Sequence, residues 1–218
     1  MKNLKKIFET QTTSVFKAVL PPVGVNTYLL YMGDRLFIVD PGIGSSELPD
    51  QIDISYSDIA LLITHSHFDH ITGIDEFPDS EILITQEAFP GLYDPSINLS
   101  GVFGGGTTVV QNKNSIVLSK GENTYRDCTF QVLVYPGHTQ GDTVFDFGSF
   151  MFTGDFVFCD SIGRTDFRFS DTDKMKKSLA KFRQFLSQKT PSTLILPGHM
   201  GECTIKDLLT KNLFLSAY

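Results

Sequence analysis

Thr64-His65-Ser66-His67-Phe68-Asp69-His70 is the stretch of sequence that decides the fold. It contains three of the five histidines of the chain, and an aspartate directly precedes the last of them. The apolar run 59–63 comes just before it and predicts a buried strand. Histidine and aspartate are common metal ligands, and an apolar core has no use for four of them within six residues. The stretch therefore predicts half of a two-metal hydrolytic site at the end of a strand.

Composition narrows the classes of protein that this chain can belong to. Its 218 residues are 41% apolar, which predicts one globular domain spanning residues 1–218. The net charge is −7, whereas binding to nucleic acid requires a clustered basic face. No apolar window is long enough to cross a membrane, and the N-terminal residues lack the apolar segment of a signal peptide. We expect no nucleic-acid or membrane partner, and the oligomeric state stays open.

The cysteines are Cys128, Cys159 and Cys203. They are odd in number, far apart in the sequence and without a metal-binding CxxC spacing, so the sequence predicts no disulfide framework. Cys159 and Cys203 lie close in sequence to motifs described below, and we expect them to be buried thiols without a chemical role. This cysteine usage favours a reducing, cytoplasmic location.

Alternation of apolar and polar residues, bounded by glycine and proline turns, predicts a chain rich in strands. The expected strands cover residues 15–20, 26–32, 36–39, 59–63, 81–85, 116–119, 129–135, 143–147, 150–153 and 193–196. The expected helices cover residues 45–53, 71–77, 172–188 and 205–211. Residues 86–115 have little regular pattern, and we interpret them as a flexible surface loop, with a substrate lid as the alternative.

Metal-capable residues recur where predicted strands end. His65, His138, Asp155 and His199 each follow such a strand, and together with the opening stretch they account for every histidine of the chain. Because strand ends that point the same way meet at one edge of a sheet, we expect these side chains to converge. Nitrogen and oxygen ligands suit two divalent ions, most simply zinc, with iron or manganese as alternatives. Such a pair of ions can generate a hydroxide that attacks a carbonyl carbon.

The same residues, in this order, resemble the pattern of the metallo-β-lactamase superfamily over nearly the whole chain. The resemblance implies an α/β fold, the αββα sandwich, in which helices flank two mixed β-sheets. It implies that His65, His67 and His138 hold a first metal ion. It implies that Asp69, His70 and His199 hold a second ion and that Asp155 bridges both. Asp69 and Asp155 would then be the catalytic carboxylates.

Two further segments resemble the glyoxalase II-like (hydroxyacylglutathione hydrolase-like) branch of that superfamily. They are residues 161–167, with the sequence Ser-Ile-Gly-Arg-Thr-Asp-Phe, and the ending Pro-Gly-His-Met-Gly-Glu at 197–202. The resemblance implies a small-molecule thioester as the substrate. For Arg164 and Asp166 we favour an ion pair that shapes the loop, with support of a metal-binding histidine as the alternative. Only 19 residues follow His199, so we expect no added helical domain for glutathione.

Other functions remain compatible with these residues. Persulfide dioxygenases share the fold and hold a single iron, here through His65, His138 and Asp155. A lactonase, another ester hydrolase or a non-catalytic metal-binding module are further alternatives. The complete set of seven ligands favours a metal-dependent hydrolase, since a second metal set has no place in a one-iron enzyme and a binding module does not require every ligand.

Overall fold

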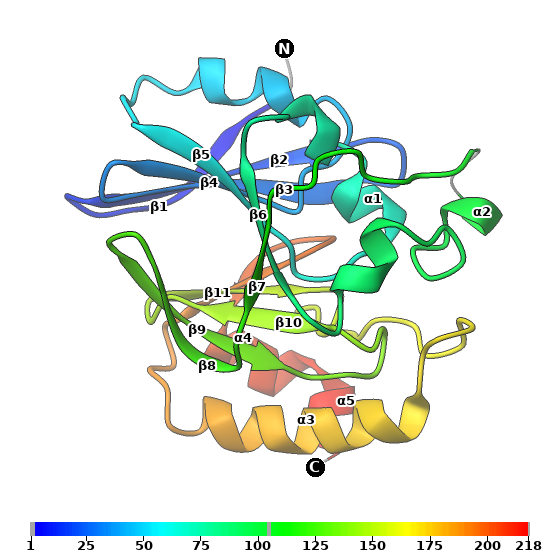
Figure 1. Ribbon diagram of the computed structural model, residues 1–218. Coiled ribbons are helices and arrows are strands. Elements are labelled where there is room, and N and C mark those ends of the chain that lie inside the picture. The colour runs from blue at the N-terminus through cyan, green and yellow to red at the C-terminus, as the bar shows by residue number, and fades with distance from the viewer. Residues whose placement is uncertain (1–2, 104–105, 218) are drawn as a thin grey trace.

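Two β-sheets packed face to face form the centre of the protein (Figure 1). The computed structural model describes residues 3–103 and 106–217. In sheet A the strands follow chain order, and their bounds are β1 (Lys5–Glu9), β2 (Thr13–Leu20), β3 (Val25–Met32), β4 (Arg35–Val39), β5 (Asp58–Leu62), β6 (Glu81–Thr85) and β7 (Ser115–Leu118). In sheet B the order is β13 (Cys203–Thr204), β12 (Leu194–Pro197), β11 (Phe150–Gly154), β10 (Thr143–Asp146), β9 (Cys128–Val134) and β8 (Gly121–Tyr125).

Helices cover the outer faces of both sheets, so the predicted αββα sandwich is confirmed (Figure 1). The α-helices are α1 (Phe68–Ile71), α2 (Ser100–Phe103), α3 (Thr172–Leu186), α4 (Ile205–Lys211) and α5 (Leu213–Ser216). The 3-10 turns are η1 (Ser45–Glu47), η2 (Pro49–Gln51), η3 (Ile74–Glu76) and η4 (Phe89–Leu92). Within the described part of the chain, no helix is long and apolar enough to cross a bilayer.

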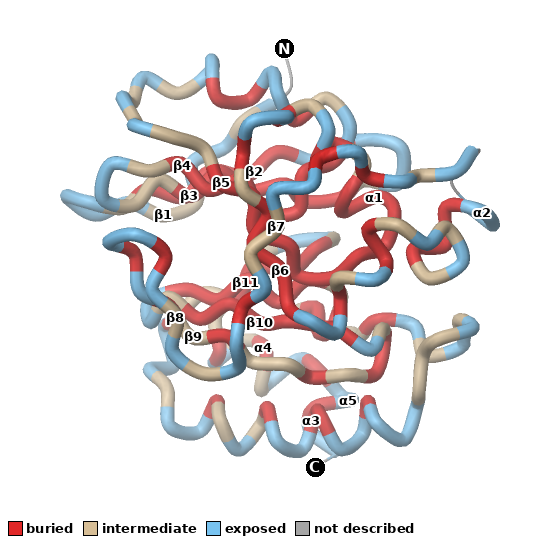
Figure 2. Tube along the Cα trace, viewed as in Figure 1, coloured by how far each residue is buried: buried red, intermediate tan, exposed pale blue. Residues whose placement is uncertain are grey.

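Aromatic side chains fill the space between the sheets. Tyr28 and Phe37 of sheet A and Phe145 and Phe152 of sheet B are fully buried there, and the rings of Tyr28 and Phe152 lie 5.1 Å apart. Such rings bury large areas and add favourable tilted contacts. Figure 2 shows the resulting pattern, with buried backbone through both sheets and an exposed outer side on α3. The core between the sheets therefore combines phenylalanine and tyrosine rings with aliphatic side chains such as Leu30, Leu62 and Val132.

Strand direction explains why chemically active residues gather at one edge. Strands β4, β5 and β6 of sheet A pair in parallel, as do β11 and β12 of sheet B. Strand β10 is antiparallel to both β9 and β11, so these two run the same way. The C-terminal ends of β9, β11 and β12 therefore meet at one edge of sheet B, and the loop that follows β5 of sheet A faces it.

Helix α3 covers sheet B with the apolar stripe that its sequence predicts. Met175, Leu179, Phe182 and Leu186 are buried at helical spacing against that sheet. Asp171 caps the helix, because its carboxylate accepts a hydrogen bond from the backbone N–H of Lys174 at 2.9 Å. This contact satisfies one of the N–H groups that a helix N-terminus otherwise leaves without a partner in the helix.

We expect Asp171→Ala to lower the free energy of unfolding by about 1 kcal/mol, because the variant loses this cap. Urea denaturation followed by circular dichroism measures the difference. Asp173→Ala, in the exposed first turn of the same helix, is the matched control, since its carboxylate pairs with the surface ammonium of Lys176 and does not cap the helix. Equal destabilisation by both substitutions would contradict a capping role.

Candidate metal centre

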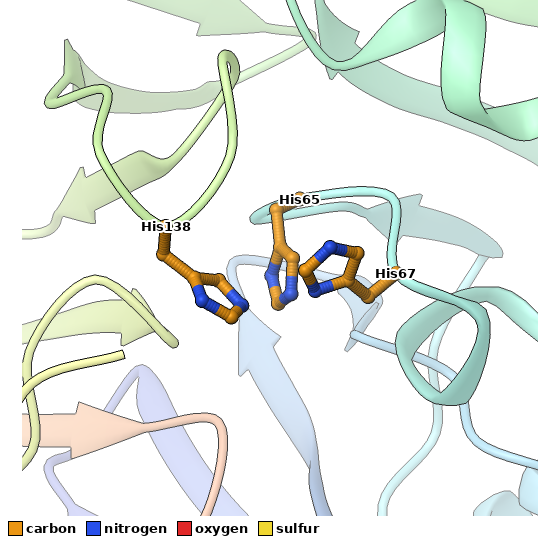
Figure 3. A group of neighbouring side chains, drawn as sticks. All are labelled: His65, His67 and His138. Atoms are coloured by element: carbon orange, nitrogen blue, oxygen red, sulfur yellow. The ribbon is translucent and has the colours of Figure 1, made fainter. Parts of the chain in front are cut away.

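Three histidines from two loops form the first cluster at the common edge (Figure 3). His65 and His67 lie in the loop between β5 and α1, and His138 lies in the loop after β9. One ring nitrogen of each lies within 4.8 Å of those of the other two, and all three side chains are buried. The structure thus brings together residues that are 73 positions apart in the sequence, between His65 and His138.

A second cluster lies beside the first. Asp69 and His70 belong to α1, and His199 follows β12. The Asp69 carboxylate oxygen Oδ2 lies 3.1 Å from His199 Nε2 and 3.4 Å from His70 Nε2. This is the same grouping that the resemblance implies for a second ion.

Asp155 lies between the two clusters. Its Oδ1 is 3.5 Å from His70 Nε2, and its Oδ2 is 3.5 Å from His199 Nε2 and 3.8 Å from His138 Nε2. One carboxylate therefore touches both groups. The close approach requires glycine at position 198, because a Cβ built there would overlap Asp155 Oδ1. The Pro-Gly-His sequence at 197–199 thus ends strand β12 and also forms part of the site.

The donor atoms of this site fit metal ions. Among the residues that the structure describes, the buried atoms without a hydrogen-bond partner include Nε2 of His65, His70 and His138 and Oδ1 of Asp155. Buried polar groups are almost always paired, so four such atoms facing one another need a ligand that accepts several lone pairs. A divalent ion bound by imidazole and carboxylate meets that need.

The Nδ1 atoms of the same histidines are held by the protein. His138 Nδ1 donates to the backbone carbonyl of Arg164 at 2.8 Å, and His199 Nδ1 donates to that of Gly24 at 3.1 Å. Because a carbonyl can only accept, both rings carry their proton on Nδ1 and keep the lone pair of Nε2 for the centre of the site. Hydrogen bonds of this kind orient metal-binding imidazoles.

Asp40 is a residue of the candidate site that the sequence pattern does not single out. Its carboxylate is buried and accepts three hydrogen bonds. Oδ2 accepts from His70 Nδ1 at 2.9 Å and from the Thr64 hydroxyl at 2.6 Å, while Oδ1 accepts from the Thr64 backbone N–H at 2.8 Å. Thr64 Oγ1 in turn lies 3.2 Å from His65 Nδ1. Asp40 thus orients a histidine of each cluster, and its only sequence signal is an aspartate at the end of an apolar strand.

The electrostatics of the two clusters differ. Burial, followed by repulsion from neighbouring imidazoles, lowers the pKa of His67 to about 3 and holds that of His65 well below its usual value. Burial also opposes the charged form of His70, but the carboxylates of Asp69, Asp155 and Asp40 outweigh it and raise the pKa of His70. The protein therefore places negative charge where the second group gathers, an environment that attracts a cation.

Arg164 and Asp166 lie at the rim of the site. Nε and Nη2 of Arg164 donate to the two carboxylate oxygens of Asp166 at 2.9 and 2.8 Å, and both side chains are exposed. The pair is the ion pair that the sequence favours, and no contact of the Asp166 carboxylate with a histidine is present among the described residues. It is the peptide carbonyl of Arg164, rather than its side chain, that positions His138.

The prediction that the chain has no disulfide is wrong. Cys159 and Cys203 form one, although 44 residues separate them, and both are half-buried rather than buried. The bond becomes possible because β12 pairs with both β11 and β13, which brings the loop after β11 next to β13. Only Cys128 is a buried free thiol. The absence of disulfides therefore no longer argues for a reducing compartment.

Residues 86–115 contribute a wall of the site, which corrects their interpretation as a surface loop. Asn98 is fully buried, and its side-chain amide donates to the backbone carbonyls of Gly91 and Thr108. Leu99 and Phe103 line a cleft of about 500 Å³ that opens onto the two clusters. Residues 104 and 105 of this segment lie outside the described part of the chain.

Comparison with known proteins agrees with this geometry. The family model described as "Metallo-beta-lactamase superfamily" matches residues 20–85. This range includes the histidine-rich stretch 64–70. The chain is 28% identical to the probable metallo-hydrolase YqgX of Bacillus subtilis, and the alignment covers 90% of this chain and 95% of that protein. It is 27% identical to the hydroxyacylglutathione hydrolase of Yersinia pestis, over 90% of this chain and 70% of that enzyme.

Among solved structures, the crystal structure of the BLEG-1 B3 metallo-beta-lactamase is similar to this one. The TM-score is 0.79 and the sequence identity 28%, over 93% of this chain and 99% of that protein. The fold of this chain is therefore similar over most of its length to that of the BLEG-1 protein.

Proposed function

We propose that this chain, which is similar to proteins of the metallo-β-lactamase superfamily, is a binuclear metal-dependent thioester hydrolase of the hydroxyacylglutathione hydrolase type. The observation that carries the proposal is the position of Asp155, whose carboxylate contacts histidines of both clusters. The relatives support a metal-dependent hydrolase. That the protein binds two ions and hydrolyses a thioester is our proposal.

We propose that His65, His67 and His138 hold one ion, that Asp69, His70 and His199 hold the other, and that Asp155 bridges them. When bound, two divalent ions lower the pKa of a water to near 7 and polarise a substrate carbonyl. Zinc suits this set of nitrogen and oxygen donors, and iron or manganese suit it as well.

The residues of this chain supply binding, orientation and proton handling. His70, His138 and His199 are oriented through Nδ1, so Nε2 of each of these three is fixed before substrate binds. The Asp69 carboxylate lies between His199 and His70, with Oδ2 at 3.1 Å from His199 Nε2 and 3.4 Å from His70 Nε2. An ionised carboxylate beside the bridging Asp155 can accept a hydrogen bond from the attacking water and so direct its lone pair toward the carbonyl.

A single-iron persulfide dioxygenase would need only His65, His138 and Asp155. The second cluster argues against it, because Asp69, His70 and His199 are equally well assembled. The hydrolase is therefore favoured by a specific arrangement of side chains, and the dioxygenase becomes an outcome of the test.

The test is metal analysis of the purified chain together with turnover on thioesters, lactones and glutathione persulfide. We expect two ions per chain and hydrolysis of a thioester such as S-lactoylglutathione or an N-acetylcysteamine thioester. One iron per chain, with oxygen uptake on the persulfide and no thioester hydrolysis, would overturn the proposal.

A further inference from the structure

The cleft above the metal-binding residues has an apolar rim. Val23, Phe103 and Met200 line it, and the exposed fractions of these side chains are 57%, 57% and 62%. They come from three separate segments, namely the turn between β2 and β3, the end of α2 and the loop after His199. Large apolar side chains that gather around one opening, rather than scattering, are typical of a surface that binds an apolar ligand.

The walls below the rim are apolar too. Phe158 and Leu99 are buried in the cleft wall, and Phe167 lies 5.7 Å from the His67 ring and 5.9 Å from the His138 ring. Phe167 also contacts the Phe103 ring at 5.8 Å, so one aromatic face runs from the rim to the histidines. A substrate whose reactive carbonyl reaches the clusters therefore lays its neighbouring groups along this face.

A smaller cavity of about 140 Å³ continues the same surface. It shares His67, His138, Leu99 and Phe167 with the cleft and adds apolar residues such as Ile97. Apolar cavities of roughly 150 Å³ are known to hold a molecule the size of benzene. The end of an acyl group or a small ring fits in this space beside the reacting carbonyl.

The cleft offers little to a charged substrate. Among the described residues that line it, Arg164 is the only lysine or arginine. The Arg164 guanidinium already donates to both carboxylate oxygens of Asp166. It also lies 4.5 Å from the centre of the Phe167 ring. Recognition of a carboxylate by a protein uses free, convergent cationic donors. A glutathione thioester carries two free carboxylates, and among the described residues that line the cleft no lysine or arginine is left free to pair with either.

We propose that the site selects uncharged, apolar thioesters, and that Phe103 and Met200 determine this selectivity at the rim. The inference rests on the proposed thioester hydrolase, and it names the chemistry of the groups on both sides of the reacting carbonyl. Burial of each added methylene is worth a few-fold in binding, so the preference should grow with chain length until the cleft is filled.

The experiment compares thioesters of N-acetylcysteamine, which has a neutral leaving group, with the same acyl groups on glutathione. The zinc-loaded full chain is assayed with acetyl, butanoyl and hexanoyl substrates. We expect kcat/KM to rise about tenfold for every two methylenes and the neutral hexanoyl thioester to exceed its glutathione counterpart at least tenfold. Equal or higher kcat/KM on the glutathione thioesters, or no dependence on chain length, would overturn the inference.

Variants separate the rim from the chemistry. Phe103→Ser and Met200→Ser are both changes at exposed side chains, and each should lower kcat/KM several-fold more for the hexanoyl thioester than for the acetyl thioester. Val117→Ser is the matched control, since Val117 is an exposed apolar side chain on β7 outside the cleft. Equal loss on acetyl and hexanoyl substrates would contradict a role in selectivity.

Failure of the proposed function gives a different result. If no thioester is hydrolysed, the hydrolase assignment fails, and calorimetric binding of the same neutral series then measures the cleft directly. Tighter binding of the hexanoyl than of the acetyl compound, lost in Phe103→Ser, would support the apolar selectivity by itself. Equal binding of the two compounds would contradict it.

Discussion

Asp155→Ala is expected to lower metal-dependent turnover more than about a hundredfold, beyond the range for residues that only support a metal ligand. The reason is its position, because the carboxylate lies within 3.8 Å of histidines of both clusters. Without it, the ions that we propose lose their common ligand, and binding of the second ion should weaken most. The measurement is kcat/KM in buffer of defined metal content, together with the number of ions per chain by mass spectrometry.

Asp160→Ala is the control for this substitution. Asp160 follows five residues later in the same loop and is exposed. We expect wild-type turnover and metal content for this variant. Unchanged turnover in Asp155→Ala itself, with the fold intact by circular dichroism, would refute the bridging role.

Asp40→Asn is expected to weaken metal binding about 10- to 100-fold, although Asp40 does not belong to either proposed ligand set. Its carboxylate accepts hydrogen bonds from His70 Nδ1 and twice from Thr64. A side-chain amide in its place has one oxygen and can accept only some of these hydrogen bonds. Asparagine suits the backbone, because residue 40 has a φ of 51° and asparagine tolerates the left-handed region. The loss should fall mainly on the cluster that contains His70.

Competition of the loaded protein against a chelator measures the affinity for each ion. Asp53→Asn is the control. Asp53 is an exposed aspartate that lies, like Asp40, in the segment between β4 and β5. If Asp40→Asn binds both ions as tightly as the wild type, the orientation of His70 does not depend on this carboxylate.

The sequence predicts the interior strands well, and the reason is physical. Strands β3, β4 and β5 are apolar over most of their length because neighbours cover both faces, so their pattern is strong. Strands β1 and β8 were missed. Their sequences, Lys-Lys-Ile-Phe-Glu and Gly-Glu-Asn-Thr-Tyr, are polar because each strand forms the edge of its sheet. Charged and polar residues suit such edges and hide the strand from a search for apolar runs.

Local motifs identify residues of the proposed ligand sets, but they do not identify residues that act through other side chains. His65 and His199 stand in motifs that can be read along the chain. Asp40 acquires its role only when β4 pairs in parallel with β5, which places it against Thr64. Likewise Cys159 and Cys203 meet because of the strand order in sheet B. These relations depend on register and strand order, which a single sequence does not contain.

The division of the proposed ligands between the two sheets would couple metal binding to folding. His65 and His67 follow a strand of sheet A, whereas His138 follows a strand of sheet B, and Asp69 and His70 face His199 in the same way. An ion held by either group therefore joins the two halves of the sandwich. A ligand that binds only the folded state adds its binding free energy to stability, about 2.7 kcal/mol at a concentration one hundred times its dissociation constant. The proposed ions would thus also hold the two sheets together. Their removal should loosen the sandwich first at the edge where the loop after β5 faces the ends of β9, β11 and β12.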